Sequence, residues 1–249
     1  MSFKLAFIGA GSLGFTQDFV KDLLAVPEFF DIEIALMDIS EKNLDMVYQL
    51  VKRDIAHNNL DNVRLIKTTD QREAVKDASY VVNAARVGGL EAFQLDVDIP
   101  LKYGIDQCVG DTLCAGGIMY GQRGIPMILD LCRDIREVAA PGCILLNHGN
   151  PNAMLTWAAN HYGGVYTIGL CHGVQHGHEI IAEVLGVSRE ELDIVCAGIN
   201  HQTWYIQVRY QGRDMTGKLL EAFEKHEHSL KTEKVRIDML KRFGYFSTE

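Results

Sequence analysis

The sequence lacks an apolar run long enough to cross a membrane, and it is poor in basic residues. Its 249 residues contain 24 lysines and arginines against 33 aspartates and glutamates, a formal net charge of −9 at pH 7. No run approaches the roughly 20 apolar residues of a spanning helix. We therefore expect no membrane partner, and the acidic balance also disfavours nucleic acid. The composition, 47% hydrophobic and 23% charged, is that of a globular protein.

CxxC pairs and internal repeats are also missing, and no secretory signal is expected. The start, MSFKLAFIGAG, becomes glycine-rich too soon for a signal peptide, and no CxxC pair occurs. We therefore expect a cytoplasmic protein with free thiols, any one of which is best explained as a small buried hydrophobic residue. The six cysteines are Cys108, Cys114, Cys132, Cys143, Cys171 and Cys196.

Apolar runs alternate with helical patterns through the first two thirds of the chain. Because the runs are continuously apolar, they predict a parallel sheet covered on both faces, a doubly wound Rossmann-like α/β fold of order 3-2-1-4-5-6. Ser40 and Asp70 are placed to cap the second and third helices. Strands are expected at 5–8, 32–38 and 63–69 and within 79–89, 142–150 and 165–171. Helices are expected over 15–24, 41–59, 71–78, 92–104, 118–139 and 152–162.

The pattern changes near residue 170, where we place a domain boundary. The stretch DIVCAGINHQTWYIQVRYQGRD predicts two strands joined tightly at 200–202, and the more charged residues 216–244 are mostly helical. Residues 1–170 are therefore expected to form the Rossmann-like domain, and residues 171–249 to belong to a second, α+β domain.

A glycine-rich turn, GAGSLG, joins the first strand to the first helix. Gly9 would permit the tight turn, Gly11 would let the backbone and Ser12 approach a pyrophosphate, and Gly14 would let helix and strand pack closely. The helix N-terminus suits phosphate groups.

Two further residues are expected at this cofactor site. Asp38 follows Gly14 by 24 positions at the end of the second strand. A carboxylate there binds ribose hydroxyls and repels a 2′-phosphate, which favours NAD over NADP. Arg86, in ARVGG, is expected at the carboxyl edge of the sheet, where ligands bind.

Cys171 directly follows the sixth strand, and His172, His176 and His178 come soon after. A disulfide, a metal site, a nucleophile and plain core packing are all compatible with this cluster. His201, at another strand end, could join Cys171 in binding a divalent metal that would then bridge the two domains. From spacing alone, however, such a pair is more often two unrelated residues. Gly173 and Gly177 argue against an ordered helix here.

Several motifs occur together in one order along the chain. They are FIGAGSLGF, ALMDI, RVGG, DTLCAGGIMYGQRGIP, LNHGNPNAM, GLCHGVQHG, CAGINHQTWY and RFGYFSTE. With them the chain resembles glycoside hydrolase family 4, the NAD- and metal-dependent glycosidases, and most of all its bacterial α-galactosidases of the melibiase type.

The resemblance implies roles for particular residues. Cys171 and His201 would bind Mn²⁺, although Zn²⁺, Fe²⁺ or Co²⁺ would also suit this ligand pair. Asn150 would contact the sugar, and His172 would help to select it. Asn152 departs from the methionine that usually follows the NP dipeptide. Family chains continue beyond Glu249 and carry their tyrosine base there, so the chain looks like an N-terminal portion whose own catalytic base is unknown. Residues 1–170 would then be the NAD-binding domain, and residues 171–249 the beginning of the substrate domain.

The resemblance also implies a mechanism for cleaving α-galactosides. NAD would oxidise C3 of the sugar, and the metal would assist deprotonation at C2. Elimination, water addition and re-reduction would follow, a route distinct from that of two-carboxylate glycosidases. The family also implies a homo-oligomer acting on a small carbohydrate.

Three alternatives remain open from the sequence. The first is an α-glucosidase or α-uronidase of the same family. The second is a simple NAD-dependent dehydrogenase of the 2-hydroxyacid type, which shares the fold and the glycine turn but needs no metal. The third is a fragment that binds NAD without catalysing a reaction.

Overall fold

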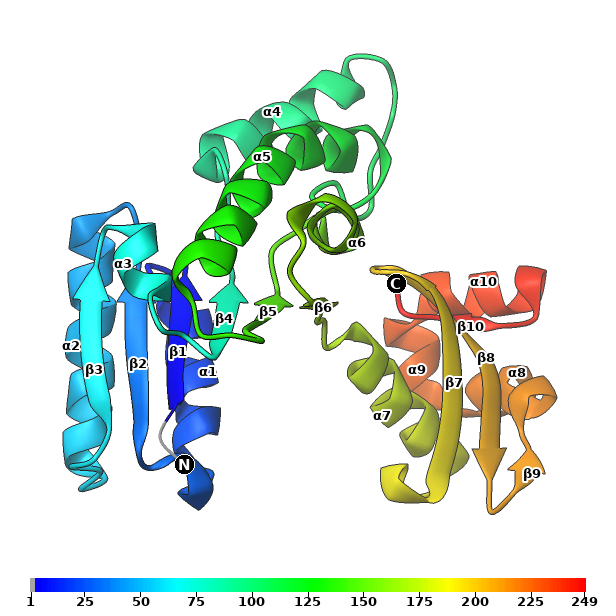
Figure 1. Cartoon of the computed structure of the whole chain (residues 1–249). Helices are drawn as coiled ribbons and strands as arrows, with labels where there is room; N and C mark the ends of the chain where they lie inside the picture. The colour runs from blue at the N-terminus through cyan, green and yellow to red at the C-terminus, as the bar shows by residue number, and fades with distance from the viewer. Residues whose placement is uncertain (1–2) are drawn as a thin grey trace. The chain divides into compact units, whose positions relative to one another are not determined.

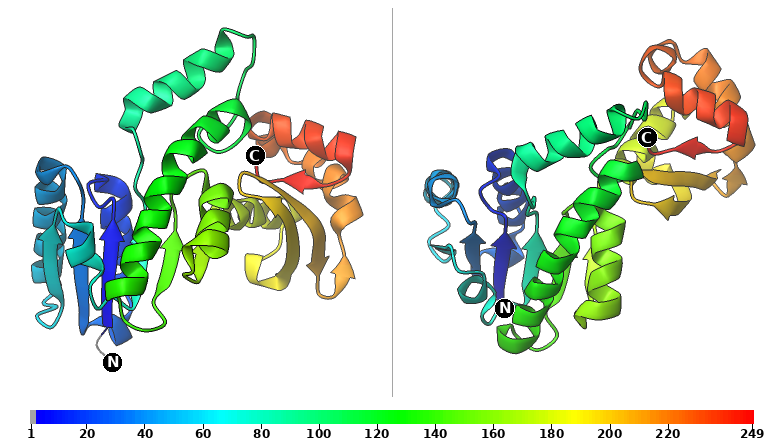
Figure 2. Two further views of the ribbon diagram at one scale, coloured as in Figure 1. Left: turned by 45° about the horizontal axis from the view of Figure 1, so that its top comes forward. Right: turned by 90° about the horizontal axis from the view of Figure 1, so that it is seen from above.

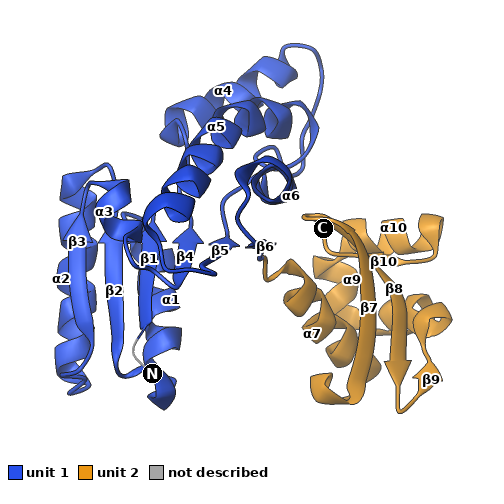
Figure 3. Ribbon diagram, viewed as in Figure 1, with its two compact units in different colours: residues 1–170 blue, residues 171–249 orange. Residues whose placement is uncertain are grey.

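The structure, a computed structural model, describes residues 3–249. It divides into two compact units, residues 1–170 and 171–249 (Figure 3). In the described part of the chain, no helix combines the length and apolar character needed to cross a membrane.

The first unit is built on a six-stranded parallel sheet. Its order is β3-β2-β1-β4-β5-β6, which confirms the predicted 3-2-1-4-5-6 arrangement of a doubly wound fold (Figure 1). The sixth strand is shorter than the apolar run 165–171 suggested. The strands are β1 Phe3–Ile8, β2 Ile32–Met37, β3 Arg64–Thr68, β4 Tyr80–Asn83, β5 Ile144–Asn147 and β6 Thr167–Gly169.

Helices cover both faces of this sheet (Figure 2). The predicted caps are confirmed, since Ser40 Oγ accepts the Asn43 N–H and the Asp70 carboxylate accepts those of Arg72 and Glu73. The helices are α1 Leu13–Leu24, α2 Glu41–His57, α3 Gln71–Val75, α4 Gly89–Leu101, α5 Cys114–Val138 and α6 Asn152–Ala158, with η1 Pro27–Phe29 and η2 Ala159–Gly163.

Two of these helices begin three or four residues earlier than the sequence pattern predicts. Helix α4 starts at Gly89 rather than near residue 92, and α5 starts at Cys114 rather than near 118. Glycine is unfavourable inside a helix, but tertiary packing requires the glycines at the start of α5. A Cβ on Gly117, for example, would lie 2.4 Å from the carbonyl carbon of Thr112.

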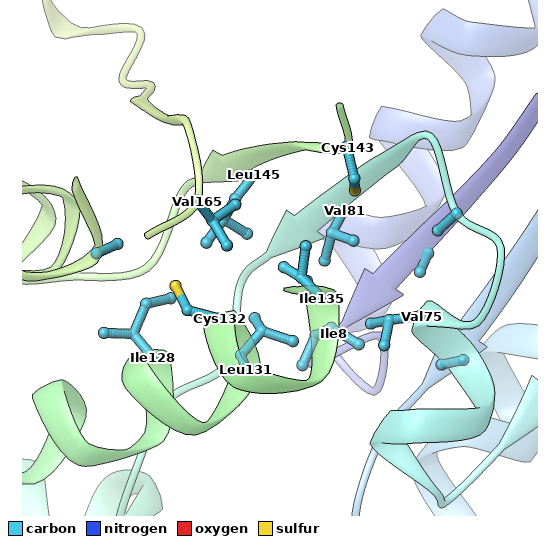
Figure 4. Close-up of a cluster of buried hydrophobic side chains, with 14 of the residues drawn as sticks. Ile8, Val75, Val81, Ile128, Leu131, Cys132, Ile135, Cys143, Leu145 and Val165 are labelled. Atoms are coloured by element: carbon cyan, nitrogen blue, oxygen red, sulfur yellow. The ribbon is translucent and has the colours of Figure 1, made fainter. Parts of the chain in front are cut away.

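Because successive side chains of a strand point to opposite faces of the sheet, the strands contribute to two separate cores. Ala6 and Ile8 of β1 face the core beneath α3 and α5, and Leu5 and Phe7 face the core beneath α1 and α2. Figure 4 shows the first of these cores, in which Cys132 is packed like an aliphatic side chain. Burial raises the pKa of the Cys132 thiol to about 11, so this cysteine is inert.

The second unit packs helices against a small antiparallel sheet of order β10-β8-β7, with β9 beside β8. A two-residue turn joins β7 to β8, as expected from the sequence. The core of the second unit is formed by apolar side chains of α7, β7, β8, α8, α10 and β10. The elements are α7 Gly173–Leu185, η3 Arg189–Glu191, β7 Leu192–Ile199, β8 Gln202–Tyr210, β9 Arg213–Asp214, η4 Thr216–Lys218, α8 Leu219–Lys225, α9 Glu227–Thr232, α10 Lys234–Phe243 and β10 Phe246–Ser247.

Helix α7 corrects the expectation that Gly173 and Gly177 prevent an ordered helix. Tyr205, which is fully buried, lies against the helix and donates a hydrogen bond from Oη to the Val174 carbonyl at 2.6 Å. A Cβ on Gly177 would lie 2.1 Å from that phenolic oxygen. Gly177 is therefore the residue that lets the tyrosine approach the helix.

We expect Gly177→Ala to destabilise the protein by about 1–3 kcal/mol, because overpacking a buried contact outweighs the gain of about 1 kcal/mol from alanine in a helix. Gly217→Ala is the control, since a Cβ there has no neighbour within 4 Å. Chemical denaturation of both variants measures the difference. Equal stability of the two variants would show that Tyr205 adjusts without cost.

Candidate functional site

The glycine turn after β1 is held tightly against its neighbours. The N–H groups of Gly9 and Ala10 both donate to the Met37 carbonyl at 2.9 Å, so the turn is tied to the end of β2. Gly9 has a φ of +86°, and a Cβ there would lie 2.6 Å from the backbone of Ala85. Only glycine fits this position, because both the backbone angle and the close approach exclude a side chain.

Asp38 holds the second half of the turn through its two carboxylate oxygens. Oδ2 accepts the N–H of Gly11 at 2.7 Å, and Oδ1 accepts the N–H of Ser40 at 2.8 Å. A Cβ on Gly11 would lie 2.6 Å from Oδ2, so a side chain here would displace the Asp38 carboxylate. The carboxylate is thereby fixed in orientation and retains acceptor sites for two further hydroxyl groups.

A pocket of about 580 Å³ lies at this carboxyl edge of the sheet, within the first unit. Its walls include four residues predicted from the sequence to bind the cofactor, namely Gly9, Ser12, Asp38 and Arg86. Gly11 joins this group through its hydrogen bond to Asp38.

Gly14 does not have the packing role expected of it. It lies in the first turn of α1, and a Cβ there would meet no neighbour within 4 Å. The expectation that this glycine allows close packing of helix on strand is therefore wrong.

Arg86 connects this pocket to a residue that the sequence reasoning missed. Its guanidinium lies 3.0 Å from Oδ2 of Asp111 and over the rings of Phe93 and Tyr120. The same Oδ2 accepts a hydrogen bond from Nδ2 of Asn150 at 3.2 Å. One carboxylate thus links a residue expected at the cofactor with one expected at the sugar.

The Asp111 carboxyl is held in its charged form. Burial is the largest influence and raises its pKa, but hydrogen bonds from Thr112, Asn150 and Arg86, together with the arginine charge, outweigh burial and lower it. The motif DTLCAGG was visible in the sequence, yet nothing local indicated that its aspartate would meet residues 25 and 39 positions away.

Buried amides fix the loop that carries Asn150. Nδ2 of Asn83 donates to Oδ1 of Asn147 at 2.8 Å across β4 and β5, and both side chains are fully buried. Asn152, the departure from the family pattern, donates to the Asn147 carbonyl at 2.7 Å. This buried amide is therefore satisfied, and it ties the start of α6 to the end of β5.

Cys171 and His201 are brought together in the second unit. Sγ of Cys171 lies 3.5 Å from Nε2 of His201, and the backbone N–H of Gly173 points at the same sulfur at 3.4 Å. His201 reaches this position from the two-residue turn between β7 and β8, where its φ is +61°. Both residues belong to one unit, which corrects the expectation that a metal held by them would bridge two domains.

The surroundings of Cys171 favour its thiolate. The hydrogen bond to His201 is the main cause that lowers its pKa, with further lowering from the Gly173 N–H and from Asn200, while burial opposes them. Within residues 3–249, no group of three or more His, Cys, Asp or Glu side chains could hold a metal. The pair would therefore leave coordination positions open.

The neighbouring histidines do not line the small cavity at this pair. His172 is exposed at the N-cap of α7, and His176 faces Glu179, with 4.0 Å between their side chains. The small cavity beside Cys171 is lined by none of His172, His176 and His178.

The first unit is an α/β protein of the dinucleotide-binding type, as defined by its sheet order, its glycine turn and the acidic residue that follows β2. The smaller second unit carries a thiol–imidazole pair. Residues 4–187 match family 4 glycosyl hydrolases, and residues 196–249 match the C-terminal domain of that family. The chain belongs to family 4 of the glycosyl hydrolases.

Known relatives agree with this assignment. The chain is 58% identical to an α-galactosidase of Rhizobium meliloti (strain 1021) over 249 residues, which are 100% of this chain and 51% of the relative. It is 34% identical to an α-galactosidase of Bacillus subtilis (strain 168) over 247 residues, 99% of this chain and 57% of the relative. The chain thus spans about half the length of these curated relatives.

A solved structure is also similar over nearly the whole chain. It is the 6-phospho-β-glucosidase of Thermotoga maritima with manganese, NAD⁺ and glucose-6-phosphate. The TM-score is 0.81 at 26% identity, and the match covers 99% of this chain and 57% of that one.

We expect Gly11→Ala and Gly14→Ala to differ in stability, although both remove a glycine of one motif. Gly11→Ala should cost about 1–3 kcal/mol by displacing Asp38, whereas Gly14→Ala should be neutral or stabilising by up to about 1 kcal/mol. Urea denaturation measures both free energies of unfolding. A comparable loss in the two variants would contradict the geometry of the turn described above.

Proposed function

We propose that this chain supplies the NAD and metal sites of a glycosidase that cleaves α-galactosides. The observation that carries the proposal is the Cys171–His201 pair at 3.5 Å, because a simple dehydrogenase with the same fold needs no such pair. The choice of galactosides rests on the 58% identity to the α-galactosidase of Rhizobium meliloti.

The pocket of the first unit fits NAD. Gly9 and Gly11 leave no space for side chains, so backbone groups can approach a pyrophosphate. The Asp38 carboxylate is fixed by two N–H groups, and its remaining acceptor sites suit the two ribose hydroxyls. When bound, NAD supplies a reversible acceptor of hydride. The manganese- and NAD⁺-containing Thermotoga maritima structure supports both cofactors.

The thiol–imidazole pair fits a divalent metal. With the bond lengths typical of zinc, about 2.3 Å to sulfur and about 2.1 Å to nitrogen, a tetrahedral angle separates the two donors by about 3.6 Å. Sγ of Cys171 and Nε2 of His201 lie close to this separation, at 3.5 Å, and the lowered pKa of the thiol favours the form that binds metals. A metal held there supplies Lewis-acid stabilisation of charge on a substrate oxygen.

Other residues of the chain hold the proposed substrate contacts in place. Asp111 orients the Asn150 amide by accepting from Nδ2, which leaves the Asn150 Oδ1 atom to accept a sugar hydroxyl. The same carboxylate neutralises Arg86 at the wall of the cofactor pocket. His172 is exposed beside Cys171 and is proposed to take part in selecting the sugar.

We also propose a cytoplasmic location, since all six cysteines are free thiols, as is usual in a reducing compartment. The homo-oligomer expected from the resemblance stays a prediction.

Release of galactose from an α-galactoside is the measurement that tests this function. The assay compares this chain with a chimera in which the second half of the Rhizobium meliloti relative follows Glu249. We expect NAD⁺- and Mn²⁺-dependent release by the chimera without net NADH, because hydrolysis is redox-neutral. Net NADH formation would instead indicate a dehydrogenase. Faster cleavage of an α-glucoside or α-galacturonide would indicate one of the other family activities, and dinucleotide binding with no turnover would indicate a binding fragment.

We expect Mn²⁺ at 100 times its Kd to stabilise the chain by about 2.7 kcal/mol, which raises the melting temperature by roughly 5–10 °C. Cys171→Ala and His201→Ala should each abolish this rise, while Cys108→Ala, which removes another exposed thiol, should not. Thermal denaturation with and without Mn²⁺ is the measurement, repeated with Zn²⁺ and Co²⁺ to identify the preferred ion. A rise that survives both alanine substitutions would place the metal elsewhere.

A further inference from the structure

The pocket of the first unit is also lined by residues that the sequence did not assign to the cofactor. They include Ile39, Gln71 and Met127, two apolar side chains and one amide. The parallel register explains why they meet, since Thr68 at the end of β3 pairs with Met37 at the end of β2. Gln71 follows β3 by three residues and Ile39 follows β2 by two, so both lie at the same edge.

The orientation of the Gln71 amide is determined by its partner. Its Nε2 donates to Oδ2 of Asp134 at 2.7 Å, and a carboxylate paired with a guanidinium can only accept. Asp134 is itself held by Arg72, whose Nη1 lies 3.1 Å from Oδ1, and its exposed fraction is 8%. The amide nitrogen must therefore face Asp134, and Oε1 is the atom left for a ligand. Among residues 3–249, no hydrogen bond to Oε1 of Gln71 is found.

We propose that Gln71, oriented by Asp134, recognises the adenine base of the dinucleotide through its exocyclic amino group. An acceptor beside two apolar side chains suits a flat base with an N–H donor at its edge, since the base ring would contact Ile39 and Met127. A base with a carbonyl at the same position would place two acceptors opposite each other. Gln71 is thus a specificity-determining residue, and Asp134 is a positioning residue that acts through it. This inference rests on the proposed binding of NAD.

The test compares binding of NAD⁺ with that of nicotinamide hypoxanthine dinucleotide, which carries a carbonyl in place of the amino group. Dissociation constants are measured by isothermal titration calorimetry on this chain and on Gln71→Met, which keeps the length of the side chain but removes the acceptor. The unmodified chain should bind NAD⁺ roughly three- to tenfold more tightly, the effect of one net hydrogen bond. In Gln71→Met the two constants should become equal.

Two further variants separate recognition from general binding. In Asp134→Asn the side chain can both donate and accept, so it no longer determines which end of the Gln71 amide faces the pocket. This variant should therefore reduce the preference for NAD⁺ although Gln71 is still present. Asp38→Ala should weaken the binding of both dinucleotides, because the ribose contact is common to both. The ratio of the two dissociation constants should therefore stay unchanged. Melting temperatures of all variants check that each is folded.

Each outcome decides the inference. A preference for NAD⁺ that disappears in Gln71→Met and narrows in Asp134→Asn supports it. Binding of NAD⁺ without a preference, or a preference that persists in Gln71→Met, overturns the role of Gln71 and leaves the proposed function intact. Failure of the unmodified chain to bind either dinucleotide overturns the proposed function and this inference together.

Discussion

The parallel register of the six-stranded sheet is the constraint on which the first unit depends. Ile8 pairs with Met37 on one side and with Asn83 on the other, and Asn83 pairs in turn with Asn147. The strands therefore end on a common line, and the residues that follow them meet at one edge. A shift of register would move Asp38 away from the glycine turn.

Aspartates then organise this edge by orienting the groups around them. Asp38 takes the N–H groups of the glycine turn, and Asp111 takes the Asn150 amide and the Arg86 guanidinium. Asp134 takes the Gln71 amide. For the Asn150 and Gln71 amides, the carboxylate only accepts hydrogen bonds, so the amide oxygen is the atom left for a ligand. Preorganisation of this kind reduces the ordering cost of binding.

The second unit shows how a small sheet can build a reactive pair. The hairpin turn between β7 and β8 carries His201 to Cys171, which lies just before α7. Buried Tyr205 packs against that helix at Gly177, and its hydrogen bond to Val174 holds the start of the helix in place. The helix that follows Cys171 and the hairpin that carries His201 therefore pack in the same core.

Much of the first unit could be predicted because its signals are local. The strand order follows from alternating apolar runs, and Gly9, Ser12, Asp38 and Arg86, which were all expected at the cofactor site, line one pocket. Predictions from local sequence were wrong where a tertiary contact, or the lack of one, determined the role of a residue. Gly173 and Gly177 argued against a helix, although Gly177 permits the close packing of Tyr205 on α7. Gly14 was expected to allow close packing of helix on strand, but a Cβ there would meet no neighbour within 4 Å.

By itself the sequence determined the period of the apolar residues, the turn chemistry and the residue types at strand ends, because these depend on a few neighbours along the chain. Only the tertiary structure decided that Asp111 joins Arg86 to Asn150 and that Asp134 orients Gln71. It also decided that Cys171 and His201 share one unit. These contacts join residues 25 to 63 positions apart. They depend on how helices pack on the sheet and how the hairpin turns, and no local pattern encodes that geometry.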